Sequence, residues 1–394
     1  MCKYLAVALL ALQSLFVVSV GAQPVPNEVQ PDVLIPAPPQ IAAKSWILID
    51  ANTGKVLVEN NSDLQLPPAS LTKMMTSFVV AGEMDNGKIS ATAMVPISVN
   101  AWQMGGSKMF VREGTEVPIE DLLRGIIVQS GNDATVALAE YVAGSESAFA
   151  DVMNQRATLL GMNKSNFLNA TGWPAEGHLT TARDLSLLAR AMIIDHPDHY
   201  KLYAEKYFEY NGIKQPNRNR LLWRDKTVDG IKTGHTEAAG YCLVASAKRG
   251  DMRLISVVMG ANTEEGRAQE SQKLLSYGFR YYETAKVYSA GDVLKADNRV
   301  WFGKEDAVDL VVNSDIFLTY PRGAREQLDG NVHIDKVIEA PLTTTGELGR
   351  LAITYQQQQL LDIPLFADHS IEEAGFFARL WDHLVLFFKG LLGG

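Results

Sequence analysis

Cysteine is nearly absent from this sequence of 394 residues, which contains only Cys2 and Cys242. Cys2 lies in an N-terminal segment that we expect to be removed, so the remaining chain has no second thiol with which to close an internal disulfide. Cys242 lies in the apolar run 241–247, which is typical of a strand, and we expect a buried, inert thiol there. The domains must therefore be stabilised by their apolar cores.

An excess of basic residues is also lacking. The chain carries 36 Lys and Arg against 45 Asp and Glu, a net charge of -9, so nothing attracts a phosphate backbone and nucleic acid is not an expected partner. Metal-ligand clusters are few as well. The segment 195–199 (DHPDH) is interpreted as a polar loop after a helix, and we expect neither a metal ion nor another cofactor.

The longest apolar run lies at the N-terminus. Residues 5–20 follow Lys3 and precede Gly21 and Ala22, a pattern typical of a cleaved export signal over residues 1–22. The run is shorter than the ~20 residues that a membrane span requires, and no cysteine lies at the cleavage point to support a lipoprotein anchor. Residues 23–40 contain six prolines, which predicts an extended spacer.

The periodicity of apolar residues predicts an α/β (α+β) fold. Two hairpins are expected, from strands 45–50 and 55–59 and from strands 241–247 and 252–259. Helical spacing lies between and after them. The predicted helices are 71–83, 119–130, 134–143, 146–160, 181–194 and 264–284. Strands at both ends of a helical segment predict one antiparallel sheet that closes around a helical insert, in a domain spanning residues 41–284.

Short β-type runs follow and predict a small all-β domain over residues 285–373. The tail, residues 374–394, predicts an amphipathic helix with Arg379, Asp382, His383 and Lys389 on its polar face. The apolar face consists of Phe377, Trp381, Leu384, Phe388, Leu391 and Leu392. Such a helix favours the membrane interface and is too short and too charged to span. The alternative is a helix docked on its own β domain.

Ser70 and Lys73 form the first of three motifs that could carry chemistry. They begin a predicted helix with apolar following turns, so the two side chains are neighbours on one face. A helix N-terminus stabilises a developing alkoxide and disfavours a protonated lysine, which makes a neutral Lys73 a candidate base. Taken alone, the motif fits a helix cap with a solvated lysine better than a catalytic pair, since ~1 or 2 matches are expected by chance. Ser70 is, however, the only serine followed by lysine three residues later.

The second and third motifs are Ser130-Gly131-Asn132, between two predicted helices, and Lys232-Thr233-Gly234, at a predicted sheet edge. A second Ser-x-Asn match at residues 98–100 makes the second motif weak by itself. A sheet edge can pair with an extended peptide, where Gly234 would let the peptide backbone approach and its two neighbours would supply donors for a carboxylate. The ordered set of three motifs is typical of penicillin-binding proteins and class A β-lactamases.

Residues 106–144, 208–223 and 228–249 closely resemble the low-molecular-mass penicillin-binding proteins that act as D-alanyl-D-alanine carboxypeptidases. The likeness runs from about residue 42 to the C-terminus and is closest to the type 5 and type 6 branch, which carries a C-terminal β domain and an amphipathic anchor. It implies a serine peptidase that removes the terminal D-alanine from peptidoglycan pentapeptide stems and binds β-lactams covalently. It also implies a location at the periplasmic face of the inner membrane.

The resemblance implies roles for individual residues. Ser70 would be the nucleophile, Lys73 the general base for acylation, and Ser130 the proton relay to the leaving D-alanine. The backbone N–H groups of Ser70 and His235 would form the oxyanion hole.

Arg267 joins the positions implied for substrate binding, although a solvated helix residue is an alternative for it. The substrate-binding positions are Asn132, Lys232, Thr233, Gly234, His235 and Arg267. Residues 105–107 and 172–178 resemble loops that border and cover the site.

Other functions share this machinery. A class A type β-lactamase would need a deacylating carboxylate, but no Glu-x-x-Leu-Asn signature lies between Ser130 and Lys232. Such an enzyme would also have no need of a β domain or an anchor. A D,D-endopeptidase would cut cross-links instead of releasing D-alanine. A non-catalytic wall-binding or sensor protein would keep the fold without turnover, against which the three intact motifs argue. The oligomeric state stays open.

Overall fold

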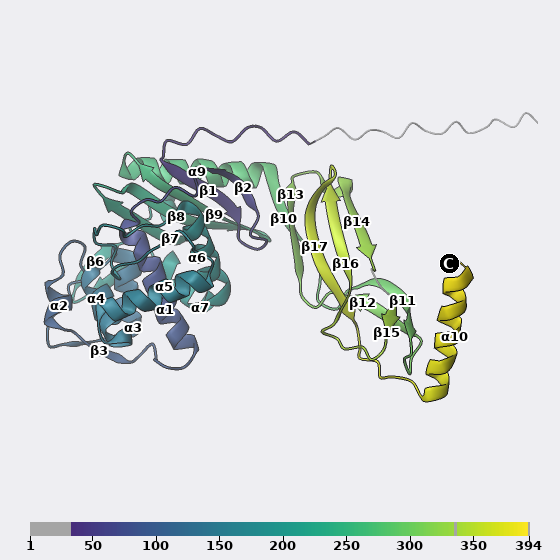
Figure 1. Ribbon diagram of the computed structural model, residues 1–394. Coiled ribbons are helices and arrows are strands. Elements are labelled where there is room, and N and C mark those ends of the chain that lie inside the picture. Colours follow the sequence, from purple (N-terminus) through teal and green to yellow (C-terminus); the bar gives the residue numbers. More distant parts are fainter. Residues whose placement is uncertain (1–32, 335–336, 393–394) are drawn as a thin grey trace, which may run out of the picture. The chain divides into compact units, whose positions relative to one another are not determined.

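The computed structural model describes residues 33–334 and 337–392 (Figure 1). The predicted export signal lies outside the described residues, as does the predicted spacer up to residue 32. Residues 33–40, the rest of the predicted spacer, contain no helix or strand.

A five-stranded sheet in the order β2-β1-β9-β8-β7 forms the centre of the first domain. Every neighbouring pair in it is antiparallel. Its strands are β1 (Ser45–Asp50), β2 (Val56–Asn60), β7 (Val228–Thr236), β8 (Gly240–Arg249) and β9 (Met252–Ala261). Because β1 of the first hairpin pairs with β9 of the second, the sheet closes around the intervening chain, which confirms the predicted fold class. Strand β7 forms one edge.

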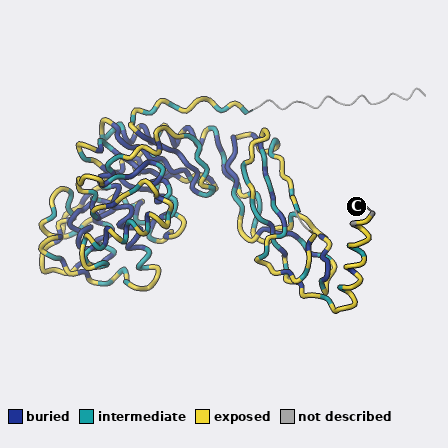
Figure 2. The backbone as a smooth tube through the Cα atoms, viewed as in Figure 1, coloured by how far each residue is buried: buried dark blue, intermediate teal, exposed yellow. Residues whose placement is uncertain are grey.

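Successive side chains of a strand point to opposite faces of the sheet, so alternate residues pack into two different apolar cores. Ile47 and Ile49 join the core shared with the helical insert, whereas Trp46 and Leu48 join the core under the helix that follows β9. Figure 2 shows this buried interior of the first domain in dark blue.

Helix α1 (Thr72–Asp85) lies inside the larger core, since residues 72–81 are all buried. A helix that is buried on every side is a rigid support for residues at its N-terminus. The other helices of this domain are α2 (Val99–Gln103), α3 (Ile119–Arg124), α4 (Asn132–Ala143), α5 (Glu146–Leu159), α6 (Ala182–Asp195), α7 (Pro197–Tyr200), α8 (Leu221–Arg224) and α9 (Glu264–Tyr281). Its small elements are η1 (Ala69–Leu71), η2 (Gly125–Gln129), η3 (Lys201–Ala204), β3 (Met94–Pro96), β4 (Glu116–Pro118), β5 (Tyr207–Tyr210) and β6 (Ile213–Pro216).

Two predicted helices differ from the observed elements. The helix predicted over 119–130 is α3 followed by a π-helical turn, η2, which ends at Ser130. The helix predicted over 264–284 ends at Tyr281, and the chain continues directly as strand β10 (Tyr282–Tyr288). The aromatic residues at this boundary are compatible with a helix or a strand. The chain forms a strand here because it pairs with β13 (Ile316–Pro321).

The second domain is all β, as predicted. Its main sheet has the order β14-β16-β17-β12-β11-β15, and β10 and β13 form a separate pair. Leu351, Ile353 and Tyr355 of β16 are buried at every second position, the pattern of a strand with one covered face. The remaining elements are β11 (Val293–Trp301), β12 (Ala307–Val311), η4 (Arg325–Gln327), β14 (Leu328–His333), β15 (Ile338–Glu339), β16 (Glu347–Tyr355) and β17 (Gln358–Ala367).

The predicted tail helix is present as α10 (Phe376–Leu392). Among the described residues, no helix has the length and apolar character that crossing a membrane would require.

Candidate active site

Ser70 lies in the single 3-10 turn η1, which runs directly into α1. Ala69, just before it, has a φ of 48°, a left-handed conformation that is costly for a residue with a side chain and that gathers at functional sites. Lys73 follows one turn later, and its Nζ lies 3.3 Å from Ser70 Oγ. The structure thus brings together the pair that the first motif predicted.

Lys73 is completely buried. Its Nζ also donates to Asn132 Oδ1 at 2.7 Å and to the Thr171 carbonyl at 2.6 Å, so the three oxygens around it are a hydroxyl, an amide and a carbonyl. The pKa of Lys73 is lowered from 10.5 to about 7, chiefly by burial and also by the charge of Arg218, whereas Glu146 and Asp133 partly oppose this shift. An amine that is half neutral at pH 7 can accept a proton.

Ser130 ends the π-helical turn in a left-handed conformation, with φ 66° and ψ 34°. Turns of this kind often mark functional sites, because they re-aim the next side chains. Lys232 Nζ donates to Ser130 Oγ at 2.9 Å. Lys232 is buried, and desolvation together with the positive charges of Lys73 and Arg218 holds its pKa well below 10.5. The second and third motifs therefore meet through one hydrogen bond.

Asn132 connects the site to the bordering loop. A protonated lysine can only donate, so the amide atom of Asn132 that faces Lys73 must be the oxygen. The amide nitrogen, Nδ2, donates to the Gly105 carbonyl at 2.8 Å. A Cβ on Gly106, which has a φ of +77°, would lie 2.9 Å from Asn132 Nδ2. This loop therefore needs glycine to approach the amide so closely.

Edge strand β7 holds the predicted carboxylate positions. Lys232 and Thr233 are buried on it, and buried Arg267 of α9 donates from Nη1 to the Gly234 carbonyl at 3.3 Å. A Cβ on Gly234 would lie 3.0 Å from the Pro68 carbonyl, so strand and nucleophile segment are packed backbone to backbone. Arg267 is thus buried against the edge strand and is not a solvated helix residue. His235, next on the strand, is exposed and stacks on Tyr241 with ring centres 4.0 Å apart.

The covering loop, residues 172–178, is fastened to the start of α1. A Cβ on Gly172, whose φ is +80°, would lie 1.8 Å from the Ala69 carbonyl oxygen, so no other residue fits. Leu168 N–H donates to His178 Nδ1 at 3.3 Å, which leaves Nε2 to donate to Thr72 Oγ1 at 3.0 Å. Burial lowers the pKa of His178 to about 4, so the ring is neutral at pH 7.

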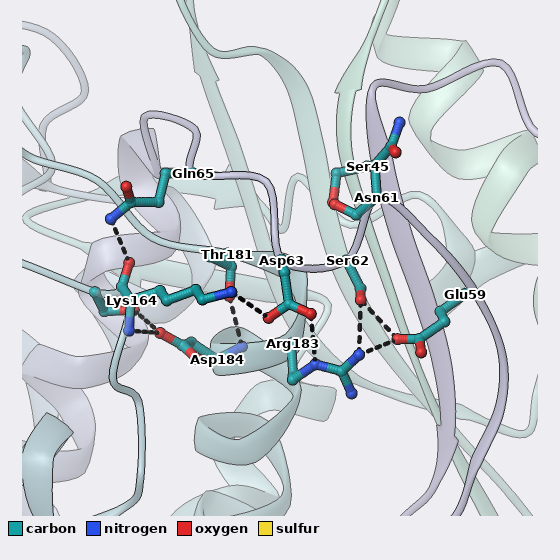
Figure 3. Close-up of polar contacts among 11 residues, drawn as sticks. Ser45, Glu59, Asn61, Ser62, Asp63, Gln65, Lys164, Thr181, Arg183 and Asp184 are labelled. Atoms are coloured by element: carbon teal, nitrogen blue, oxygen red, sulfur yellow. Dashed lines mark hydrogen bonds and ion pairs between the residues drawn. The ribbon is translucent and has the colours of Figure 1, made fainter.

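Figure 3 shows the charged contacts that hold the segment before the nucleophile. Arg183 of α6 donates to Asp63, Ser62 and Glu59 at distances of 3.2, 3.0 and 2.5 Å (Figure 3). Lys164 Nζ also pairs with Asp63, at 3.2 Å. These half-exposed groups form a network rather than a single pair. A network contributes more to the stability of the fold than an isolated surface ion pair does.

Known proteins are similar to this chain in sequence and in fold. The family described as D-alanyl-D-alanine carboxypeptidase matches residues 32–263, and the domain described as penicillin-binding protein 5, C-terminal domain, matches residues 282–373. The chain belongs to this carboxypeptidase family.

Relatives within the carboxypeptidase family match nearly the whole chain. The D-alanyl-D-alanine carboxypeptidase DacA of Escherichia coli K12 is 44% identical over 91% of both chains. The crystal structure of penicillin-binding protein 5 from Haemophilus influenzae is 42% identical, with a TM-score of 0.82 over 86% of this chain and 99% of that one. A D-alanyl-D-alanine endopeptidase of Pseudomonas aeruginosa is 30% identical over 73% of this chain and 92% of its own. The family that the resemblance indicated is confirmed, and the chain is an enzyme, a serine-type peptidase.

Three groups in this family site carry no motif signal in the sequence. Arg218, Glu146 and the Thr171 carbonyl all act on Lys73, yet they come from distant segments and from residue types that are common everywhere. Only the tertiary structure identifies them. The second Ser-x-Asn match is explained differently, since Ser98 caps α2 by accepting from Ala101 N–H and donating to Glu140.

Proposed function

We propose that this D-alanyl-D-alanine carboxypeptidase removes the terminal D-alanine from peptidoglycan pentapeptide stems through an acyl-enzyme on Ser70. The observation that carries the proposal is the buried Lys73 amine, with a pKa of about 7, 3.3 Å from the Ser70 hydroxyl. A serine hydroxyl is a weak nucleophile at neutral pH and needs a base of this kind to attack an amide carbonyl.

Acylation begins when neutral Lys73 takes the proton of Ser70 Oγ as this oxygen attacks the carbonyl between the two D-alanines. The backbone N–H groups of Ser70 and His235 stabilise the oxyanion that forms. Ser130 then gives its proton to the leaving nitrogen and recovers one from Lys232, whose Nζ lies 2.9 Å away. Free D-alanine departs, and water hydrolyses the ester when the same groups act on it in the reverse sense.

The free carboxylate of the substrate explains why this cleft is rich in positive charge. Lys232 and Thr233 precede Gly234 on β7, Arg267 of α9 donates to the Gly234 carbonyl, and Asn132 accepts from Lys73. A peptide that pairs with the edge of β7 places its terminal carboxylate among these donors.

Mass analysis of a peptidoglycan pentapeptide after incubation tests the proposal. Loss of one alanine per stem is the expected product. Conversion of a cross-linked dimer to monomers, with the free pentapeptide untouched, would instead support the endopeptidase.

β-lactams are the proposed covalent inhibitors. Penicillin-binding protein D2 of Listeria monocytogenes, solved in its ampicillin-bound form, is 31% identical with a TM-score of 0.56 over 61% of this chain. The same Ser70 Oγ would open the lactam ring. Rapid steady hydrolysis of the drug, rather than a persistent adduct, would favour the β-lactamase alternative.

Helix α10 supports attachment to a membrane surface. Its polar face contacts the β domain: buried Asp382 accepts from Phe302 N–H at 2.7 Å, and Lys389 lies over the Trp301 ring at 5.2 Å. Its apolar face is left exposed, with Trp381 67% accessible. The helix is thus docked on its own domain by one face and offers the other to the lipid interface. Together with the predicted export signal, the exposed apolar face supports the proposal that the enzyme lies at the periplasmic side of the inner membrane.

A further inference from the structure

Asp133, the residue that follows the second motif, carries a completely buried carboxylate in the first turn of α4. Three successive backbone N–H groups of one turn donate to it. Oδ1 accepts from Met109 at 2.8 Å, and Oδ2 accepts from Phe110 at 2.8 Å and from Val111 at 3.2 Å. A buried carboxylate is stable only with donors of this kind, so the turn and the carboxylate hold each other in place.

Phe110 gives the 109–111 turn a shape that suits an anion. Its φ is 70°, a left-handed conformation that is costly for a residue with a large side chain. Such a residue within a turn can point successive N–H groups toward one place, which is the concave arrangement that binds anions. The Phe110 ring is 46% exposed, so burial of the ring does not explain the conformation, whereas the hydrogen bonds to Asp133 do.

Asn132, the neighbour of Asp133, holds the other end of the same loop. Its backbone N–H donates to the Ser107 carbonyl at 2.7 Å, and its Nδ2 donates to the Gly105 carbonyl at 2.8 Å. A Cβ on Gly131 would lie 2.9 Å from Asp133 Oδ1 and 3.0 Å from the Met109 nitrogen, so the loop comes this close only beside a glycine. Two consecutive residues of α4 therefore fasten the loop 105–111.

The loop bears on the reaction because it fixes the Asn132 amide. Oδ1 of this amide accepts from Lys73, the proposed base, at 2.7 Å, while Gly105 holds Nδ2. Release of the 109–111 turn would let the amide rotate away from Lys73 and from the peptide that it is proposed to bind. An error of about 1 Å in the placement of such a group can cost about 10²-fold in rate.

We propose that Asp133 is a positioning residue for acylation. It holds the loop 105–111 against α4 through the 109–111 turn and so keeps the Asn132 amide in place between Lys73 and the substrate. The proposal rests on the function proposed above, because it assigns a role within the same site.

The test measures the second-order rate constant for covalent labelling of the full chain by a fluorescent penicillin at pH 8.5. The charge of Asp133 raises the pKa of Lys73, so its loss can only leave more of this amine neutral. At pH 8.5 the amine is largely neutral in either case, and loss of the charge alone should not slow labelling. Thermal unfolding shows that each variant is folded at the assay temperature.

The first pair of variants removes a buried carboxylate inside and outside the site. Asp133→Asn should slow labelling about 10- to 100-fold, since the new amide group turns N–H groups toward the donors of the turn. Asp50→Asn is the matched control. Asp50 is also completely buried and accepts from a turn N–H, that of Thr53 at 2.9 Å, so this variant should lower the Tm and keep the rate constant.

The second pair alters the turn from the loop side. Phe110→Pro removes the N–H and cannot adopt a φ of 70°, so it should label as slowly as Asp133→Asn. Phe110→Gly loses the same ring but keeps the N–H and adopts this φ freely, so it should label like the native chain. Adding Phe110→Gly to Asp133→Asn should recover part of the lost rate, because the turn then depends less on the carboxylate.

Equal rate constants for the two asparagine variants, or for Phe110→Pro and Phe110→Gly, would overturn the positioning role alone. A double variant as slow as Asp133→Asn would overturn it too, because the carboxylate would then act by something other than holding the turn. If Asp133→Asn does not fold, the pair at Phe110 decides. A native chain that neither labels with penicillin nor releases D-alanine from a pentapeptide would overturn the proposed function, and the positioning role with it.

Discussion

The pH dependence of acylation is the sharpest consequence of the Lys73 environment. If neutral Lys73 is the base, the second-order rate constant for covalent labelling by a fluorescent penicillin should rise with pH and level off above about 7, the pKa of this amine. The sign follows from the mechanism, because the proton acceptor is the form that prevails above the pKa.

The size of the effect follows from the lowered pKa. A lysine with a pKa of 10.5 is about 0.03% neutral at pH 7, whereas Lys73 at about 7 is roughly half neutral. The rate constant should therefore fall about fivefold between pH 7 and pH 6 and about ninefold between pH 6 and pH 5, or about 50-fold in all. Labelling is measured from quenched time points at several drug concentrations.

Two variants that leave the motifs intact should move this profile in opposite directions. Arg218 lowers the pKa of Lys73 and Glu146 raises it, so Arg218→Gln should shift the rise to higher pH and Glu146→Gln to lower pH. The glutamine at position 146 keeps an oxygen that can accept from the Ala170 N–H, as the native carboxylate does at 3.0 Å.

Lys73→Arg removes the base altogether and should slow acylation roughly 10²- to 10⁴-fold, since a guanidinium stays protonated.

A flat profile between pH 5.5 and 8.5 would refute the reasoning. So would shifts of the same sign in the two glutamine variants, or near-normal labelling of Lys73→Arg, because each would mean that another group deprotonates Ser70.

Three further predictions concern other parts of the chain. Ser70→Ala should abolish D-alanine release and penicillin labelling together, and an adduct on any other serine, found by peptide mapping, would contradict the nucleophile assignment. Arg267→Ala should reduce peptide turnover by about 2 to 5 kcal/mol in transition-state binding, and reduce acylation by ligands without a matching carboxylate much less; equal small losses in kcat/KM would make Arg267 a structural residue. Replacing Trp381 and Phe388 by Asp should release the full-length protein from vesicles in sedimentation, whereas added salt should release it only partly; continued sedimentation of the variant would disprove attachment through α10.

The sequence by itself determined the family and the fold class, and it supplied the main candidate site residues. Ser70 and Lys73 are one helical turn apart, so local geometry alone makes them neighbours. The hairpins and the buried helix α1 follow from apolar periods that the chain shows directly. Lys232 at a sheet edge could be placed in the same way, because a strand pattern leads into it.

Only the tertiary structure decided what makes these residues reactive. The pKa of Lys73 depends on complete burial and on the charges of Arg218 and Glu146, which packing brings from distant segments. The meeting of Ser130 with Lys232 likewise joins a π-helical turn to a strand, and no local period predicts it.

The tail and the loop 105–111 also combine features that the sequence predicts with features that only the tertiary structure shows. Amphipathicity predicted α10, but not that its polar face docks on the β domain through Asp382 while the apolar face stays open. The family resemblance predicted that residues 105–107 border the site, but not that the buried Asp133 carboxylate binds the 109–111 turn. Local periods in a sequence report which face of an element is apolar, whereas burial, charge coupling and cavities arise from contacts between elements, which no single segment encodes.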